Sequence, residues 1–236
     1  MNVRDLGGVP TQRGETRFGV LVRADNVRRL TETGWSDLYE HGVRRIVDLR
    51  WPEELAEDVP REVDIEVVHI SLLGELDLDY MDDVDDYLES DDPIGYWASF
   101  YVAVLEEYHA NFGAVVAAIA DAPEGVVLFH CAGGKDRTGL IAALLLRLAG
   151  ASIEEVAADY ALTEANLVAV TGSWIDEAPT ESERRRRVFK QQTPVAAMSR
   201  TLDALDEQYG DVRAYLREAG VTDDQLDRLR LRLVAP

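Results

Sequence analysis

One segment of this chain combines residue types that together can carry out chemistry on a phosphate group. It reads VVLFHCAGGKDRTGL over residues 126–140. Its apolar half predicts a buried strand that ends at His130, and its polar half predicts a loop that enters a helix at about Thr138. Loops of this kind in α/β proteins open at the carboxyl edge of the sheet, where ligands bind. We therefore expect the functional site in this loop.

The loop has the features of a cradle for a dianion with a sulfur atom at its base. Gly133 and Gly134 permit the backbone conformations of a tight anion-binding nest. The following helix contributes unpaired N–H groups and a partial positive charge. Arg137 follows Cys131 by six residues, and its planar guanidinium can hold two oxygens of one phosphate. The predicted phosphate-binding residues are Ala132, Gly133, Gly134, Lys135, Asp136 and Arg137.

Cys131 lies where a cysteine can act as a nucleophile. Helix N-termini and nearby cations favour the thiolate form of cysteines in general, and the thiolate is the reactive form. Thr138 can donate its hydroxyl to the sulfur and make it a better leaving group, while His130 fixes the loop through hydrogen bonds. A lone cysteine after an apolar strand is more often a small buried apolar residue. The joint pattern His-Cys-x5-Arg-Thr-Gly favours the catalytic interpretation here.

The composition of the whole chain limits its partners. Its 236 residues include 45 acidic and 24 basic side chains, which gives a net charge of -21. This balance argues against nucleic acid and, less strongly, against stable association with an anionic membrane. The single cysteine excludes an intramolecular disulfide and a cysteine-cluster zinc site. We expect a cytoplasmic protein without a metal or other cofactor; its acidic excess fits a halophilic source or an arginine-biased genome equally well.

The elements around the loop predict an α/β fold. Apolar runs predict strands at residues 20–23, 45–49, 65–71 and 126–130. Helical patterns occupy residues 31–41, 96–120 and 138–149, and capping residues at 152 and 222 begin two further helices. We expect one domain over residues 1–236, with a central, mostly parallel sheet flanked by helices and an all-helical C-terminal part. Residues 165–195 are a candidate lid-like helical insertion.

The loop HCAGGKDRTG resembles the signature loop of cysteine-dependent protein tyrosine phosphatases, with C-x5-R-[ST] present as Cys131, Arg137 and Thr138. More specifically, the chain resembles microbial tyrosine and dual-specificity phosphatases whose loop reads like HC-x-x-GKDRTG. Further similar stretches are residues 2–8, 21–31, 45–54, 159–167 and 198–226. The resemblance implies a metal-independent phosphatase fold, a phosphocysteine intermediate, and phosphotyrosine or other phosphomonoester substrates.

The resemblance also implies roles for individual residues. Cys131 attacks phosphorus, and the N–H groups of the loop and Arg137 hold the phosphate oxygens. A general acid must protonate the leaving oxygen. The family carries aspartates inside the loop and in its DLR element, here Asp136 and Asp48, and we predict these as the functional acids ahead of Asp92. Either of the two could instead brace its surroundings.

Other charged residues have open interpretations. Lys135 accompanies, in the resembled family, activity on phosphotyrosine, phosphoserine or phosphothreonine, and sometimes phosphoinositides. Four charged residues fall in family-like stretches and can either line the pocket or form salt bridges that support the sheet: Arg4, Asp5, Arg23 and Arg50. The run of four arginines at residues 184–187 can meet an anionic substrate, pair with the acidic tract of residues 76–92, or form a solvated helix face.

Two other functions use a similar strand, loop and helix. A catalytically silent module would bind phosphate or phosphoproteins without turnover, but the intact Cys131 and Arg137 speak against it. Sulfur transfer would use the same thiol, but the Arg-Thr-Gly ending of the loop weighs against that chemistry. We therefore predict a phosphatase that acts on a phosphorylated protein or a small phosphomonoester.

Overall fold

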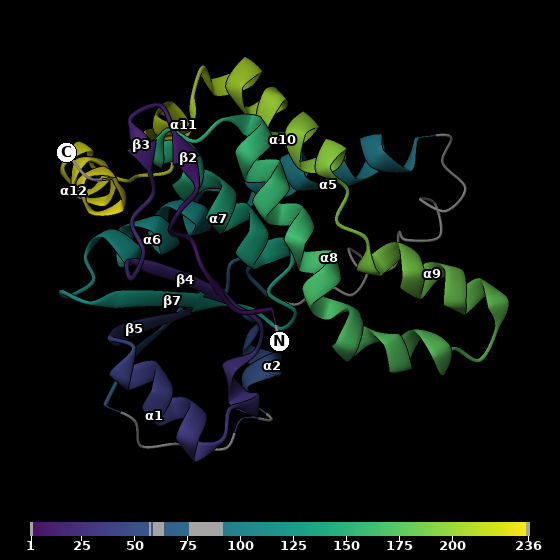
Figure 1. Ribbon diagram of the computed structural model, residues 1–236. Coiled ribbons are helices and arrows are strands. Elements are labelled where there is room, and N and C mark those ends of the chain that lie inside the picture. The colour runs from purple at the N-terminus through teal and green to yellow at the C-terminus, as the bar shows by residue number, and fades with distance from the viewer. Residues whose placement is uncertain (1, 57, 59–63, 76–91, 235–236) are drawn as a thin grey trace.

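The computed structural model describes residues 2–56, 58, 64–75 and 92–234 of the chain (Figure 1). Its centre is a five-stranded sheet with the strand order β1-β4-β7-β5-β6. The strands are β1 (Arg4–Asp5), β4 (Leu21–Ala24), β5 (Val43–Asp48), β6 (Glu66–His69) and β7 (Val126–His130). Strands β4, β7, β5 and β6 pair in parallel, and β1 pairs with β4 in the antiparallel sense. The prediction of a mostly parallel central sheet is confirmed.

The parallel strands end together at the carboxyl edge of the sheet. His130, at the end of β7, stands opposite Ala24 of β4 on one side and Asp48 of β5 on the other. Asp48 in turn stands opposite His69, the last residue of β6. This register brings the residues that follow the strands to one place, the edge where parallel α/β sheets bind ligands.

Helices make up most of the remaining described chain. Before β7 these are α1 (Glu32–Glu40), α2 (Pro52–Leu55), α5 (Pro93–Glu107) and α6 (His109–Ala120). After β7 they are α7 (Asp136–Ala149), α8 (Ile153–Asp176), α9 (Glu181–Gln191), α10 (Val195–Tyr209), α11 (Val212–Glu218) and α12 (Asp223–Leu233). Among the described residues beyond 150 there is no strand, and a single bridge joins Val234 to Thr16. The all-helical C-terminal part is confirmed.

Side chains of β7 alternate between the two faces of the sheet, and helices cover both faces. Val127 and Phe129 belong to the larger apolar core, whereas Val126 and Leu128 belong to a smaller one. The smaller core is covered by α1, whose apolar side chains pack against it. The larger core lies on the opposite face, under α6, α7 and the helices beyond them (Figure 1).

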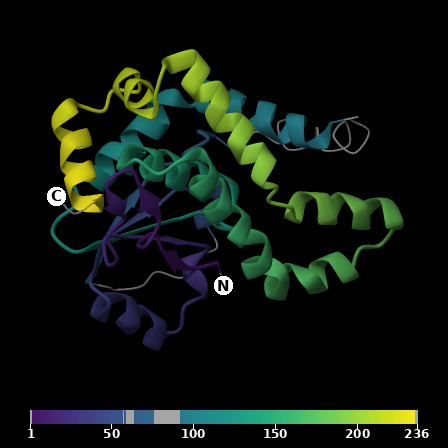
Figure 2. The ribbon, with the colours of Figure 1, turned by 45° about the horizontal axis from the view of Figure 1, so that its top comes forward.

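Helix α7 is the centre of the helical layer. Nearly all of its residues are buried, because the sheet lies on one side and α6, α8, α11 and α12 pack around the others. Its N-terminus is therefore held firmly at the carboxyl edge of the sheet. The far half of α8 and helix α9, which include most of residues 165–195, extend to one side of this layer (Figure 2).

The structure adds detail that the sequence patterns do not contain. Residues 96–120, which carry one helical pattern, form two helices that are separated at Tyr108, where φ is -100° and ψ is 23°. Strand β1 and the hairpin of β2 (Pro10–Thr11) and β3 (Gly14–Glu15) are too short to produce a hydrophobic period. The acidic tract of residues 76–92 lies outside the described residues, except for Asp92. In the described part of the chain, no helix has both the length and the apolar character needed to cross a membrane.

Candidate active site

The loop between β7 and α7 contains the predicted nucleophile. Cys131 follows β7 directly and is 3% exposed, and α7 begins at Asp136. Gly134 has a φ of 63°, and a Cβ atom at this position would lie 2.5 Å from the carbonyl oxygen of Ala24. Both facts require glycine. A Cβ atom on Gly133 would meet nothing within 4 Å, so a structural requirement for glycine exists at the second of the two positions only.

Side chains behind the loop hold its carbonyl groups. Asn2 donates from Nδ2 to the carbonyl oxygens of Gly133 and Gly134, at 3.2 and 2.9 Å. Arg23 donates from Nη2 to the carbonyl of Gly134 at 2.9 Å. In a trans peptide the N–H points opposite to the C=O of the same unit. The N–H groups of residues 134 and 135 therefore point away from Asn2 and Arg23, as an anion-binding loop requires.

A buried ion-pair network supports these contacts. Asp159 of α8 accepts from Arg4 Nε at 2.8 Å and from Arg23 Nη1 at 2.6 Å. Burial raises the pKa of Asp159, but the two guanidinium groups outweigh burial and hold it below its ordinary value. Burial lowers the pKa of Arg23 in spite of Asp159, because this side chain is 0% exposed. Arg4 and Arg23 thus form supporting salt bridges, one of the two roles left open by the sequence.

Arg137 is fixed by residues that follow β5. Its Nη1 and Nη2 donate to the two carboxylate oxygens of Glu54, at 2.6 and 3.1 Å. Its guanidinium carbon lies 4.3 Å from the centre of the Trp51 ring. Burial lowers the pKa of Arg137, but negative charge on Cys131 and the contact with Glu54 outweigh burial and raise it. The cation of the predicted phosphate site is therefore permanently charged and restrained.

Asp48 is buried beneath the loop in a network of its own. It is 3% exposed and accepts hydrogen bonds from Arg50 Nε and Nη2, the latter at 2.6 Å. Burial raises the pKa of Asp48, but the Arg50 hydrogen bonds and nearby positive charge lower it below the ordinary value. His130 Nε2 lies 3.6 Å from Asp48 Oδ2, and burial lowers the pKa of His130, which keeps the imidazole neutral near pH 7. Its Nδ1–H donates to the Cys131 carbonyl at 3.2 Å.

Asp136 has a different environment. Its side chain is 41% exposed, and its Oδ1 accepts from the hydroxyl of Tyr101 at 2.5 Å. The Tyr101 hydroxyl also lies 2.6 Å from that of Tyr160. Burial and the charge of Asp136 raise the pKa of Tyr101 well above its ordinary value, so the phenol remains a donor. Asp136 is thus an accessible carboxyl group that a buried pair of tyrosines orients.

Lys135 contacts helix α9. Its Nζ donates to the backbone carbonyl of Lys190 at 2.6 Å and lies 4.4 Å from the centre of the Trp97 ring. Asp136 Oδ1 is 3.4 Å from the same nitrogen. With 6% exposure, Lys135 connects the loop to α5 and α9.

The sequence also points to Thr138, Asp92 and the run of four arginines at residues 184–187 as candidate functional residues. The Thr138 hydroxyl is buried and forms no hydrogen bond to any described residue, including Cys131. Asp92 accepts from the N–H of Gly95 at the start of α5 and pairs with Arg200 at 2.6 Å. Within the arginine run, Arg187 pairs with Glu183 on the same helix at 2.7 Å.

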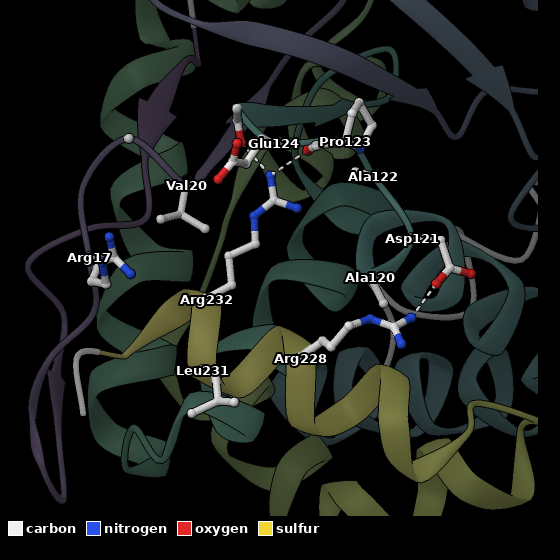
Figure 3. Close-up of a pocket in the computed structure, with 12 residues that line it drawn as sticks. Arg17, Val20, Ala120, Asp121, Ala122, Pro123, Glu124, Arg228, Leu231 and Arg232 are labelled. Atoms are coloured by element: carbon white, nitrogen blue, oxygen red, sulfur yellow. Dashed lines mark hydrogen bonds and ion pairs between the residues drawn. The ribbon is translucent and has the colours of Figure 1, made fainter.

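An open groove of about 690 Å³ lies near the opposite, amino edge of the sheet (Figure 3). Two of its three arginines bind protein groups: Arg232 donates to the carbonyls of Pro123 and Gly125, and Arg228 pairs with Asp121 at 2.5 Å. These contacts fasten α12 to the turn between α6 and β7. The groove therefore lies where α12 packs on the turn between α6 and β7, at the sheet edge opposite Cys131.

Several residues of the site lie outside the sequence prediction. Glu54 and Trp51 belong to the stretch RWPEE, in which the sequence indicates only a short helix with carboxylates at its positive end. The signal that Glu54 offers is its place just after a strand that reaches the same sheet edge as Cys131. Asn2 and Tyr160 fall in the family-like stretches 2–8 and 159–167, but nothing local to them or to Tyr101 indicates contact with the loop, because only the tertiary fold brings them there.

The sheet, the loop and the entering helix fit the phosphatase fold that the sequence resemblance implies. Comparison with known proteins assigns the family: the profile of the tyrosine phosphatase family matches residues 1–235. The chain belongs to this family and is a phosphatase, a hydrolase of phosphoric monoesters.

Two relatives illustrate the range of the family. The chain is 31% identical over 229 residues to a tyrosine-protein phosphatase of Nostoc commune, with 90% of this chain and 73% of the relative covered. It is 28% identical over 275 residues to the triple specificity protein phosphatase PtpB of Mycobacterium tuberculosis, with 97% and 95% covered. Both similarities extend over most of each chain.

Proposed function

We propose that the protein hydrolyses phosphomonoesters through a phosphocysteine intermediate on Cys131. The observation that carries this proposal is the meeting of a buried cysteine, a restrained arginine and a loop whose carbonyls are held from behind. The loop N–H groups and Arg137 supply the positive charge that the transferring phosphoryl group needs. The reaction therefore requires no metal ion.

The reaction has two balanced steps. The Cys131 sulfur donates an electron pair to phosphorus, and the bond from phosphorus to the leaving oxygen breaks as an acid protonates that oxygen. Water then attacks the phosphocysteine and loses a proton to the conjugate base. The sulfur–phosphorus bond breaks, its electrons return to the sulfur, and inorganic phosphate leaves.

Asp136 is the better candidate for the acid. It is accessible and adjacent to Arg137, and its partners Tyr101 and Lys135 leave one carboxylate oxygen without a bond to any described residue. Asp48, the second aspartate predicted as an acid, is buried and ion-paired with Arg50, and the lowered pKa keeps it ionised. We assign Asp48 a supporting role: together with His130 it braces the end of β7.

The proposed substrates are phosphotyrosine proteins and small aryl phosphates, with phosphoserine, phosphothreonine or phosphoinositides as further members. The names of the relatives, which include tyrosine and triple specificity phosphatases, support this range. The single cysteine supports a reducing compartment such as the cytoplasm, where a reactive thiol survives. Residues 165–195, which include the far half of α8 and helix α9, are the proposed lid-like part, and Lys135 contacts the carbonyl of Lys190 within it.

Hydrolysis of an aryl phosphate in the presence of EDTA tests the proposal. We expect wild-type turnover, no turnover in Cys131→Ser, and a 32P-labelled, thiol-linked enzyme after rapid quenching of the wild type. Folded wild-type protein that binds phosphate without turnover would instead support the silent module.

The acid is tested separately. Asp136→Asn should slow the hydrolysis of substrates with poor leaving groups far more than that of substrates with good ones. It should also remove the alkaline limb of the profile of rate against pH. Asp48→Asn should lower stability and leave both of these signatures in place. The reverse pattern would transfer the acid role to Asp48.

A further inference from the structure

The guanidinium of Arg137 is engaged by the protein along one of its edges only. Its end-on edge, formed by Nη1 and Nη2, donates two hydrogen bonds to Glu54 at 2.6 and 3.1 Å. The second hydrogen of Nη1 points toward the carbonyl of Leu49, with 3.5 Å between nitrogen and oxygen. Three of the five N–H donors of the guanidinium therefore have protein acceptors.

The two remaining donors are Nε–H and the second hydrogen of Nη2, neither of which has an acceptor among the described residues. These two hydrogens lie side by side on the same edge of the planar group. A guanidinium edge with two parallel N–H groups matches two oxygens of one phosphate. The Glu54 contact thus decides which edge of Arg137 is presented to an anion.

Glu54 is itself held in position. Its Oε2 accepts from the backbone N–H of Trp51 at 2.8 Å, which closes the first turn of α2. The guanidinium carbon of Arg137 lies over the Trp51 ring, 4.3 Å from the ring centre, so the ring limits movement of the group on that side. The arginine is therefore restrained along one edge by Glu54 and on one side by Trp51. Trp51 is itself buried, with 9% exposure.

We propose that Glu54 is a positioning residue for phosphate: it turns Arg137 so that the Nε and Nη2 edge faces the phosphoryl group above Cys131. This inference rests on the proposed function and says how Arg137, the main cation of the proposed site, is oriented. Glu54 touches neither the phosphate nor the sulfur in this assignment. It acts only through Arg137.

The test compares Glu54→Ala and Glu54→Gln with Glu53→Ala. Glu53 is the adjacent carboxylate on α2, is exposed, and pairs with no described side chain, so its removal is the matched control. We expect kcat/KM for an aryl phosphate to fall about 10- to 100-fold in Glu54→Ala, because an arginine misplaced by about 1 Å costs this much. Inorganic phosphate should inhibit this variant correspondingly less. Glu53→Ala should stay within about twofold of the wild type.

A double-mutant cycle separates positioning from general structural damage. In an Arg137→Ala background, Glu54→Ala should cost no further activity, because the group through which it acts is gone. If the two losses simply add, or if Glu54→Ala and Glu54→Gln both match Glu53→Ala, the inference is wrong. Urea denaturation shows whether each variant is folded at the assay temperature. If Glu54→Ala is unfolded, the activity of Glu54→Gln decides whether the inference holds.

Binding measurements keep this inference distinct from the proposed function. In a Cys131→Ser background, calorimetric titration with inorganic phosphate needs no turnover. Weaker binding after Glu54→Ala supports the positioning role even if wild-type turnover is absent, whereas unchanged binding overturns it even if the wild type is an active phosphatase.

Discussion

Replacement of Asp159 by asparagine provides a direct test of how the phosphate loop is supported. The asparagine has nearly the same shape and can still accept hydrogen bonds, so the change removes charge rather than volume. It leaves Arg23, which is 0% exposed, without its counter-charge in the interior. Loss of one partner from a buried ion pair costs about 3–5 kcal/mol. That is a large part of the total stability of about 5–15 kcal/mol for a typical domain.

Urea unfolding followed by circular dichroism measures this cost. The matched control is Asp227→Asn, which removes the same charge from an exposed pair with Arg213, where the side chain of Asp227 is 62% exposed. We expect a loss of at most about 1 kcal/mol in the control. For Asp159→Asn we expect the free energy of unfolding to fall by about 3–5 kcal/mol. Phosphate should also inhibit less, because Arg23 holds the Gly134 carbonyl.

The pH dependence has a defined sign. The pKa of Asp159 is lower in the folded protein than in the unfolded chain. Its contribution to stability is therefore fully present above the unfolded value of about 4, and is lost as pH falls through the folded value. The difference in stability between wild type and Asp159→Asn should be constant near neutrality and shrink below about pH 4. A cost equal to that of the control at pH 7, or a difference that grows on acidification, would refute the reasoning.

Three further changes probe other parts of the molecule. Tyr101→Phe removes the donor to Asp136 and should lower kcat about 2- to 10-fold and shift the alkaline limb of the pH profile, with little change in phosphate inhibition. Gly134→Ala should abolish measurable turnover, because its Cβ would collide with the Ala24 carbonyl, while Gly133→Ala stays near wild-type rates. Arg232→Ala should lower the free energy of unfolding, measured by urea denaturation, by about 1–2 kcal/mol and leave kcat unchanged, because its carbonyl partners lie at the other edge of the sheet.

Some of this structure is predictable from local sequence alone. The run VVLFH forms β7 over the predicted residues. All five side chains are buried, so a short apolar run is enough to predict the strand. Thr222 and Gln225 form the capping box that their spacing indicates at the start of α12. Both features depend on neighbours within a few positions in the chain.

Other parts depend on contacts between distant residues and have no local signal. Strand β1 exists because two residues pair with β4, and nothing in Arg4–Asp5 itself indicates a strand. Glu54 reaches Arg137 across 83 positions, and the contact follows from the common end of β5 and β7 at one sheet edge. A sequence pattern can identify the loop that is predicted to bind an anion, but the residues that restrain this loop become visible only through the register of the sheet.

The three carboxylates around the loop show how their partners separate their roles. Asp48 and Glu54 each face an arginine, and hydrogen bonds from that arginine lower the pKa of each in spite of burial. Such groups hold cations well and release no proton near neutrality. Asp136 accepts instead from a neutral phenol and is the most exposed of the three. In a chain with a net charge of -21, carboxylates that an arginine neutralises can lie beside the proposed phosphate site at the least electrostatic cost. Asp136 has no arginine partner, only Tyr101 and Lys135, and this sets it apart as the proposed acid.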